Sequence, residues 1–312
     1  MRAPLLLVVN QGSATVSLVD PQSDRTTATI QEGVPSMFGH EVAVSGDGRF
    51  AYVPLYSDVG LGKPGSNGDT ILVLDIANAR ISRKLSFGHG VRPHLPVLDR
   101  ATGLLYVTTE LEKAVTVIDT KTMTIVGAVP TGAEQSHMLV ISRDGHTGYT
   151  ANVSSGTISV LDLQKRTLVR KIPVAPTIQR IAISPDDKTL VTADQSSPRL
   201  AFIDTATGSV HDWVTLPTLG YGSAFSKDGT MLLVTLPATG QVVAIDVAGK
   251  HIVHTIDVGP HPQAVLIRPD GKRAYVSCLG SNYVSVVDLA TWQVVDRIET
   301  GQKADGMAWL AR

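Results

Sequence analysis

The chain has 312 residues, of which 43% are hydrophobic and 18% charged, and its formal net charge is −1. This composition supports a large buried core and excludes a disordered chain, and the balanced charge excludes the bulk attraction of a basic protein for nucleic acid. The one cysteine, Cys278, excludes an internal disulfide, and no apolar run reaches the roughly 18–20 residues of a membrane span. The apolar start runs directly into strand-like alternation without a cleavage site, so we do not interpret it as a signal peptide.

In chain order, the first predicted elements are three short strands that end near residue 31: PLLLVVN, TVSLVD and TTATIQ. A four-part unit then recurs. Its first strand leads into a Ser-x-Asp-Gly turn or a variant of it, the second is a run such as FAYVPL, the third carries Val or Ile beside Asp, and the fourth is amphipathic. No helical periodicity is sustained anywhere. We therefore predict an all-β chain of short antiparallel strands.

The repeat can be measured from the first residue of each unit. The seven first strands are HEVAVSGDG, HLPVLDRATG, HMLVISRDG, QRIAISPDD, YGSAFSKDG, QAVLIRPDG and DGMAWLAR. They begin at His40, His94, His137, Gln179, Tyr221, Gln263 and Asp305. The last four intervals are each 42 residues, after one of 54 and one of 43. Four strands per unit of about 40 residues are typical of a propeller blade.

The sequence thus predicts a seven-bladed β-propeller with four-stranded blades, formed by residues 1–312 as a single domain. The seventh blade is expected to combine residues 305–312 with residues 1–31. The C-terminal strand would then join the three N-terminal strands, close the ring and remove an open sheet edge.

The second-strand signatures YVTT, YTAN, YVSC and LVVN, with SPDG-like turns and VIDT or VVDL third strands, resemble the YVTN-repeat, YncE-like β-propellers. The resemblance spans essentially the whole chain. It implies seven blades and, commonly, an exported bacterial location, so we expect a periplasmic or extracytoplasmic protein, with a cytoplasmic location left open. It does not imply an activity, because many members have none assigned.

The first residue of each innermost strand should lie at one mouth of the central channel. Three consecutive blades place histidine there: His40, His94 and His137. Equivalent Cα atoms of neighbouring blades should be roughly 7–10 Å apart, so three imidazoles can reach one ion. Imidazole suits Zn, Cu or Fe, and three histidines with an open position are typical of a catalytic metal site. The alternative is that the three are hydrogen-bonded rim residues without a ligand.

Two acidic residues lie near this rim. Glu41 follows His40, and Asp305 opens the closing strand. Either carboxylate could move a proton for a metal-bound water or orient a histidine. Alternatively, Glu41 is a solvated loop charge and Asp305 bonds backbone at the ring closure.

Candidate substrate-contacting residues at the same mouth are Arg92, Arg180, Tyr221, Gln179, Gln263 and Tyr56. The arginines could instead form rim salt bridges. The long interval after His40 arises from a Gly-, Pro- and Ser-rich insertion at residues 56–69, which we expect to be a loop folded over the site or a loose surface loop.

Two functions remain open. The first is a metal-dependent hydrolase of lactone or ester type, or an oxidoreductase if the metal is redox-active. The second is a non-catalytic scaffold that binds a small molecule or a protein, with Tyr56 and Tyr221 as exposed contacts. In both cases we expect a monomer without nucleic-acid partners.

Overall fold

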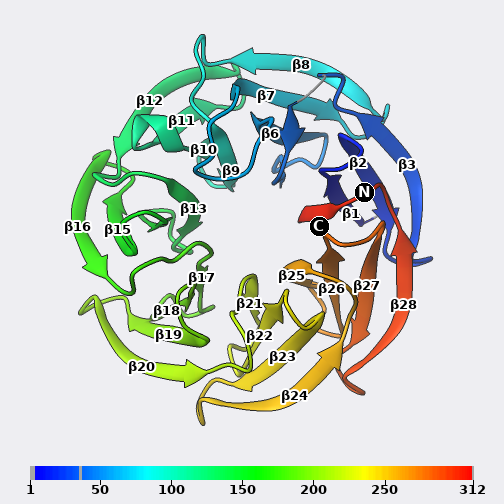
Figure 1. Cartoon of the computed structure of the whole chain (residues 1–312). Helices are drawn as coiled ribbons and strands as arrows, with labels where there is room; N and C mark the ends of the chain where they lie inside the picture. The colour runs from blue at the N-terminus through cyan, green and yellow to red at the C-terminus, as the bar shows by residue number, and fades with distance from the viewer. Residues whose placement is uncertain (1–3, 35–36, 311–312) are drawn as a thin grey trace.

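The computed structural model describes residues 4–34 and 37–310, and it is a ring of seven antiparallel sheets (Figure 1). Six of the sheets have four strands, and in the remaining one the innermost strand is divided into two short strands, β4 (Phe38–Gly39) and β5 (Ala43–Val44). The predicted fold is confirmed. Residues 1–3 and 311–312, which we assigned to the seventh blade, lie outside the described residues.

Each blade runs from an innermost strand at the channel to an outermost strand at the rim. Blade 1 contains β4 (Phe38–Gly39) with β5 (Ala43–Val44), then β6 (Phe50–Ser57), β7 (Asn67–Asp75) and β8 (Arg80–Ser86). Blade 2 contains β9 (Pro93–Asp99), β10 (Leu104–Thr109), β11 (Ala114–Asp119) and β12 (Thr124–Pro130), with a single 3-10 turn, η1 (Glu110–Glu112), after β10. Blade 3 contains β13 (Ser136–Ile141), β14 (Thr147–Asn152), β15 (Thr157–Asp162) and β16 (Thr167–Pro173).

The second half of the ring repeats this plan. Blade 4 contains β17 (Ala182–Ile183), β18 (Thr189–Asp194), β19 (Arg199–Asp204) and β20 (Ser209–Thr215). Blade 5 contains β21 (Ser223–Phe225), β22 (Met231–Leu236), β23 (Gln241–Asp246) and β24 (His251–Asp257). Blade 6 contains β25 (Pro262–Ile267), β26 (Arg273–Cys278), β27 (Tyr283–Asp288) and β28 (Gln293–Glu299).

Blade 7 closes the ring. Its strands, from the channel outward, are β29 (Ala304–Leu310), β1 (Leu5–Asn10), β2 (Thr15–Asp20) and β3 (Arg25–Gln31). The ladder between the two ends of the chain pairs Leu5 with Leu310 and Val8 with Met307. The chain ends are therefore held in one sheet, as the repeat predicts.

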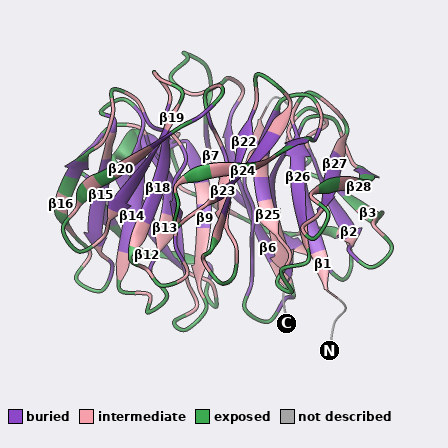
Figure 2. Cartoon of the chain, turned by 90° about the horizontal axis from the view of Figure 1, so that it is seen from below, coloured by how far each residue is buried: buried purple, intermediate pink, exposed green. Residues whose placement is uncertain are grey.

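The core lies between blades rather than inside any one of them. The second and third strands are buried on both faces, whereas the outermost strands alternate buried and exposed residues (Figure 2). At one interface, Leu7 and Val9 of blade 7 pack against Val53 and Leu72 of blade 1. Two-sided burial explains why the middle strands read as continuous apolar runs.

The repeated motifs have physical causes. In the first Ser-x-Asp-Gly turn, the Ser45 hydroxyl donates to Asp47 at 2.7 Å and accepts from the Phe50 amide, while Gly48 adopts a φ of +69°. The asparagine that ends a YVTN-like strand reaches its neighbour: Asn152 Nδ2 donates to Thr157 and Ser159 of β15. These polar links fix the register between the second and third strands.

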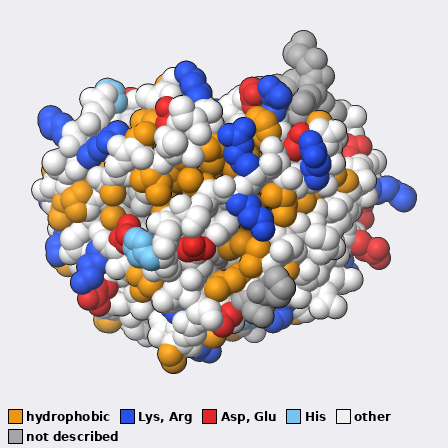
Figure 3. Space-filling model, turned by 90° about the horizontal axis from the view of Figure 1, so that it is seen from above, with side chains coloured by type: hydrophobic (Ala, Val, Ile, Leu, Met, Phe, Trp, Pro, Cys, Tyr) orange, Lys and Arg blue, Asp and Glu red, His pale blue; other side chains and the backbone are white. Residues whose placement is uncertain are grey.

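Charged side chains of both signs are interspersed with hydrophobic ones on the face seen in Figure 3. No helix within residues 4–34 and 37–310 has the length and hydropathy needed to cross a membrane.

Candidate functional site at the channel mouth

The three predicted histidines come together at one mouth of the channel. Each lies where the chain enters an innermost strand, and the rings form a contiguous group: the His40 and His94 centroids are 5.4 Å apart, and those of His94 and His137 are 3.6 Å apart. His94 and His137 are buried and His40 is mostly so. We call these three residues the histidine cluster.

Two of the rings are oriented by buried carboxylates. Asp305 Oδ2 lies 3.1 Å from Nδ1 of His40, and Glu110 Oε1 contacts Nδ1 of His137. An ionised carboxylate can only accept, so Nδ1 is the protonated nitrogen in both rings, and Nε2 carries the lone pair. This arrangement is found around metal-ligating histidines, where it fixes ring orientation and increases ligand basicity.

The third ring, His94, lacks such a partner. Its buried Nδ1 forms no hydrogen bond. Burial, followed by the adjacent imidazoles of His137 and His40, holds the pKa of His94 well below its usual value. His94 is therefore neutral at physiological pH, which is the state that ligates a metal.

Glutamines from two blades complete the polar shell. Gln11 Nε2 lies 3.0 Å from Nε2 of His40, and Gln179 Nε2 lies 3.4 Å from Nε2 of His137. Gln179 also donates to the Tyr221 hydroxyl at 2.9 Å. A ligand that binds the imidazole lone pairs has to displace these amides.

The donor chemistry fits a transition metal, but the ring spacing fits only in part. Two imidazoles that share one ion at right or tetrahedral angles have centroids about 4.5–5 Å apart, given metal–nitrogen bonds of ~2.0–2.1 Å. The His40–His94 spacing is close to this value, whereas the centroids of His94 and His137 are closer together than one shared ion allows. Among the described residues, no three His, Cys, Asp or Glu side chains are already arranged as a ligand set.

Tyr56 is part of this site, but it is not the exposed contact that we expected. It is 1% exposed, its hydroxyl donates to Glu110 Oε2 at 2.8 Å, and its ring meets His94 edge-on at 5.3 Å between centroids. The expectation of exposure was wrong because β6 continues to Ser57, and this places the Tyr56 ring inside the ring wall.

Glu41, Arg180 and Asp305 form a second buried group, which we call the cross-channel cluster. Arg180 Nη2 lies 2.8 Å from Glu41 Oε1 and 3.5 Å from Asp305 Oδ1. Burial disfavours the charged form of Arg180 and by itself would lower its pKa, but the two carboxylates outweigh burial and raise the pKa of Arg180. Burial also disfavours the charged form of Glu41, which raises the pKa of Glu41. The interpretation of Glu41 as a solvated charge was wrong, since the side chain is 5% exposed.

Arg92, which we predicted to contact substrate, is hydrogen-bonded to the insertion and its border. Its Nε donates to Asn67 Oδ1 at 2.6 Å and its Nη2 to the carbonyl of Lys63 at 2.8 Å. The guanidinium therefore holds the insertion. The connecting segment is shorter than residues 56–69, because β6 ends at Ser57 and β7 begins at Asn67.

The insertion lies over blades 2 and 3. Besides its bonds to Arg92, a Cβ placed on Gly62 would lie 3.2 Å from Nε2 of Gln135, two residues before His137. The expectation of a loop folded over the site agrees with these contacts.

Sequence reasoning missed three residues of the shell: Glu110, Gln11 and Glu32. Glu110 begins η1, and Gln11 follows β1. Glu32 follows β3 and is fully buried; it accepts a hydrogen bond from the Gly39 amide at 3.1 Å, and burial raises its pKa to about 7. A search for polar residues just after the second or fourth strand of each unit could have found all three.

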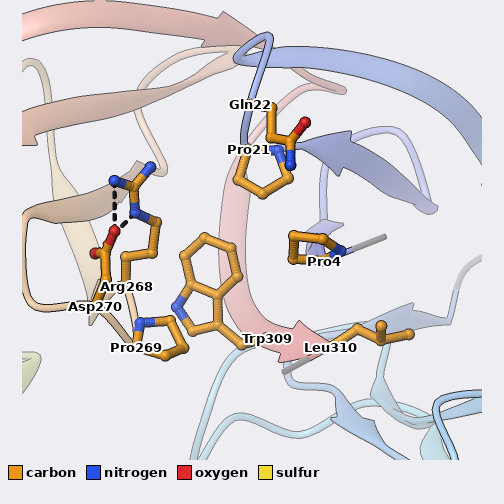
Figure 4. A pocket seen from close by; sticks show the side chains of 8 residues that line it. All are labelled: Pro4, Pro21, Gln22, Arg268, Pro269, Asp270, Trp309 and Leu310. Atoms are coloured by element: carbon orange, nitrogen blue, oxygen red, sulfur yellow. Dashed lines mark hydrogen bonds and ion pairs between the residues drawn. The ribbon is translucent and has the colours of Figure 1, made fainter. Parts of the chain in front are cut away.

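A separate hollow of about 420 Å³ lies on the opposite face, between blades 6 and 7 (Figure 4). It contains Trp309, and Arg268 in its wall is paired with Asp270 at 2.7 Å. It belongs to the closing blade and not to the histidine cluster.

Comparison with known proteins gives the family. A model described as "Lactonase, 7-bladed beta-propeller" matches residues 69–226, half of the chain. The chain belongs to this lactonase-propeller family. Individual relatives are more distant: the seven-bladed β-propeller protein Rv1057 of Mycobacterium tuberculosis is 27% identical over 62% of this chain and 58% of its own length. The uncharacterized protein YncE of Salmonella typhimurium is 24% identical over 60% of this chain and 55% of its own length, which agrees with the predicted YncE-like resemblance.

The chain spans little more than half the length of these curated relatives. Among solved structures, hydrazine synthase of Kuenenia stuttgartiensis matches with a TM-score of 0.79 and 21% identity, covering 92% of each chain. Dihydro-heme d1 dehydrogenase NirN matches with a TM-score of 0.69 and 13% identity over 95% of this chain and 63% of its own. At such identities the likeness concerns the fold of a lactonase-type propeller and not its chemistry.

Proposed function

We propose that the channel mouth hydrolyses a small lactone or ester with the help of a divalent transition metal held by His40, His94 and His137. The observation that supports this most is the pair of carboxylate–histidine contacts. Asp305 and Glu110 each occupy the Nδ1 side of a ring, so Nε2 carries the lone pair that can bind a metal once the Gln11 and Gln179 amides are displaced. Membership of a lactonase family adds the reaction class.

A bound metal would act there as a Lewis acid that polarises the carbonyl and lowers the pKa of water. The residues of the chain do the remaining work. Asp305 and Glu110 hold their rings in one tautomer, and His94 stays neutral. The Tyr221 hydroxyl accepts from Gln179, so its own proton is free to be donated to a substrate oxygen.

The catalytic proton needs a carboxylate near the histidines. Asp305 contacts His40, and Glu41 lies beside Asp305 in the cross-channel cluster with a raised pKa. We assign the proton to one of these two groups, as the sequence suggested. The insertion at residues 58–66 shields the blade 2 and blade 3 side of the mouth from solvent, because it is fixed by Arg92.

Elemental analysis of protein purified without a metal-affinity tag tests the metal. We expect about one transition-metal ion per chain, lost in a variant with alanine at all three histidines and retained in His89→Ala, whose ring is at the surface and bonded to Glu112. Hydrolysis of a panel of lactones and nitrophenyl esters should be abolished by a chelator and restored by added metal. A metal content that is low and equal in all variants would overturn the proposal.

One observation favours the second function, a binding scaffold without catalysis. The rings of His94 and His137 are tilted by 31° with 3.6 Å between centroids, and they have to separate before both can ligate one ion. If the protein carries no metal and hydrolyses nothing in the panel, but binds small molecules at the mouth equally well after the triple alanine substitution, the scaffold is the correct function.

A further inference from the structure

A cleft of about 640 Å³ opens on the same face as the histidine cluster, on the far side of the channel mouth. Its lining residues come from blades 4 and 5, which are neighbours in the ring (Figure 1), and from the entry to blade 6. Its lining comes from the β18–β19 and β22–β23 connections, the segment joining blades 4 and 5, and the start of blade 6: Gln195, Pro198, Pro217, Thr218, Leu219, Gly220, Tyr221, Pro237, Ala238, His261 and Gln263. A volume of this size is in the range of small-ligand sites, about 300–1,000 Å³.

The lining is chemically selective. Three prolines form its walls, and Leu219 is 40% exposed with its side chain toward the surface rather than in the core. Among the described residues that line the cleft there is no Lys, Arg, Asp or Glu. Because the proline ring fixes φ, these walls are preformed and lose little conformational entropy when a ligand binds.

Two polar side chains of the cleft, Gln195 and Tyr221, have hydrogen-bond partners that define their roles. The Gln195 amide is already used, since it donates to the Gly220 carbonyl at 2.8 Å. Tyr221 connects the two sites: its ring lines the cleft, and its hydroxyl accepts from Gln179, whose Nε2 lies 3.4 Å from His137 Nε2. A molecule that contacts Tyr221 in the cleft is therefore separated from the histidine cluster only by the Gln179 side chain.

We infer that this cleft binds the hydrocarbon part of a neutral small molecule and sets the substrate class of the site as alkyl- or aryl-substituted lactones or esters. A phosphorylated or highly charged substrate would bury its charge against walls that offer no fixed opposite charge. The inference rests on the proposed function for the reacting group, but the cleft itself can be tested by binding alone.

The experiment measures binding of a homologous series of γ-lactones, from γ-hexalactone to γ-dodecalactone, by isothermal titration calorimetry on the full chain. Affinity should increase by roughly three- to fourfold for each methylene that enters the cleft, and then level off once the cleft is filled. Hydrolysis of the same series is followed separately.

Two variants act on the cleft by different means. Leu219→Asp places a charge in its wall, and Ala238→Trp fills it from an exposed turn, so that one of them remains informative if the other fails to fold. Val253→Asp is the control, because Val253 is 39% exposed, almost the same as Leu219, but lies on the outer strand β24. Thermal unfolding of each variant checks that the ring is intact.

The inference predicts that both cleft variants lose the chain-length trend and that Val253→Asp keeps it. A wild-type affinity that does not change with chain length, or a trend that survives both cleft variants, overturns the inference. The two proposals fail separately. A chain-length trend without hydrolysis refutes the hydrolase and leaves the cleft, whereas hydrolysis without the trend refutes the cleft and leaves the hydrolase.

Discussion

Arg180 of blade 4 reaches across the channel to Glu41 of blade 1, with 2.8 Å between Nη2 and Oε1. The two blades are three apart in a ring of seven, so the ion pair joins nearly opposite walls. Asp305 of blade 7 completes the contact at 3.5 Å. Near the mouth of the channel, these charged side chains therefore form ion pairs that connect blades 1, 4 and 7.

We predict that Arg180→Met destabilises the protein by about 3–5 kcal/mol, because two carboxylates are then left buried without a counter-charge. Urea unfolding measures the loss. Adding Glu41→Gln to Arg180→Met should recover part of it, since one of the stranded charges is removed. Lys113→Met is the control: its ion pair with Glu134 is exposed, so its loss should change stability by less than about 1 kcal/mol. If Arg180→Met and Lys113→Met lower the free energy of unfolding equally, the buried ion pairs of Arg180 do not stabilise the ring as predicted.

The closing strand depends on one glycine. Gly306 donates to the His40 carbonyl at 2.8 Å, and a Cβ there would lie 2.5 Å from Glu41 Oε2 and even closer to that carbonyl. Gly306→Ala should therefore cost about 1–3 kcal/mol through overpacking against backbone. Gly46→Ala, with no atom within 4 Å of its added Cβ, should be nearly neutral. Thermal unfolding of the two variants measures this difference: Gly306→Ala should lower the unfolding temperature, and Gly46→Ala should leave it nearly unchanged.

Glu32 should give stability an unusual pH dependence. Burial raises its pKa to about 7 from 4.5, so the folded state binds a proton that the unfolded state releases between these values. Stability from this group is present below pH 4.5 and is lost as the pH rises to 7. Glu32→Gln should exceed the wild type in stability by less than about 1 kcal/mol at pH 5 and by up to about 3 kcal/mol at pH 8.

The measurement is urea unfolding of both proteins at the two pH values. Glu134→Gln serves as control, since Glu134 is exposed and paired with Lys113. If the gain of Glu32→Gln is the same at pH 5 and pH 8, the buried carboxyl does not titrate in this range and the prediction fails.

Glu110 should act as a positioning residue. It accepts from Tyr56 and contacts Nδ1 of His137, so Glu110→Gln removes the charge that fixes the ring tautomer. We expect zinc affinity, measured by competition with a chromophoric chelator, to fall about 10–100-fold. The nitrogen chemical shifts of His137 should also move toward a mixed tautomer, which a merely structural role would not cause. Glu112→Gln, two residues away and facing the surface His89, should change neither.

The regular parts of the molecule could be predicted because they repeat. Most equivalent strands recur at intervals of 42 or 43 residues, and the three histidines occupy the same position of three consecutive units, so both the ring and the histidine cluster could be predicted from one sequence. Glu110 and Gln11 each follow the second strand of one blade, a position that marks them as candidates, but the residue type at this position varies between units. Their role depends on which blades meet, and spacing along one chain does not contain that information.

Burial at the start of the innermost strand of blade 1 could not be predicted from alternation. His40 and Glu41 are consecutive, but both face the interior, because β4 and β5 are separate short strands and residues 40–42 between them are not in a ladder. The two-residue period applies only within a regular strand. The same departure placed Arg180, beside the short β17, in the channel.

The pairing of β29 with β1 has a consequence for synthesis. The two strands are separated by nearly 300 residues of sequence, so β1 is synthesised long before β29 and remains an unpaired sheet edge until β29 has been made. A chain that has not yet formed β29 is therefore an open ring with an unpaired strand edge at β1. The β29 strand of a second copy nearby can pair with this edge. We expect nascent chains of this protein to be prone to exchanging β29 between copies, and chaperone contact with β1 to last until β29 has been synthesised.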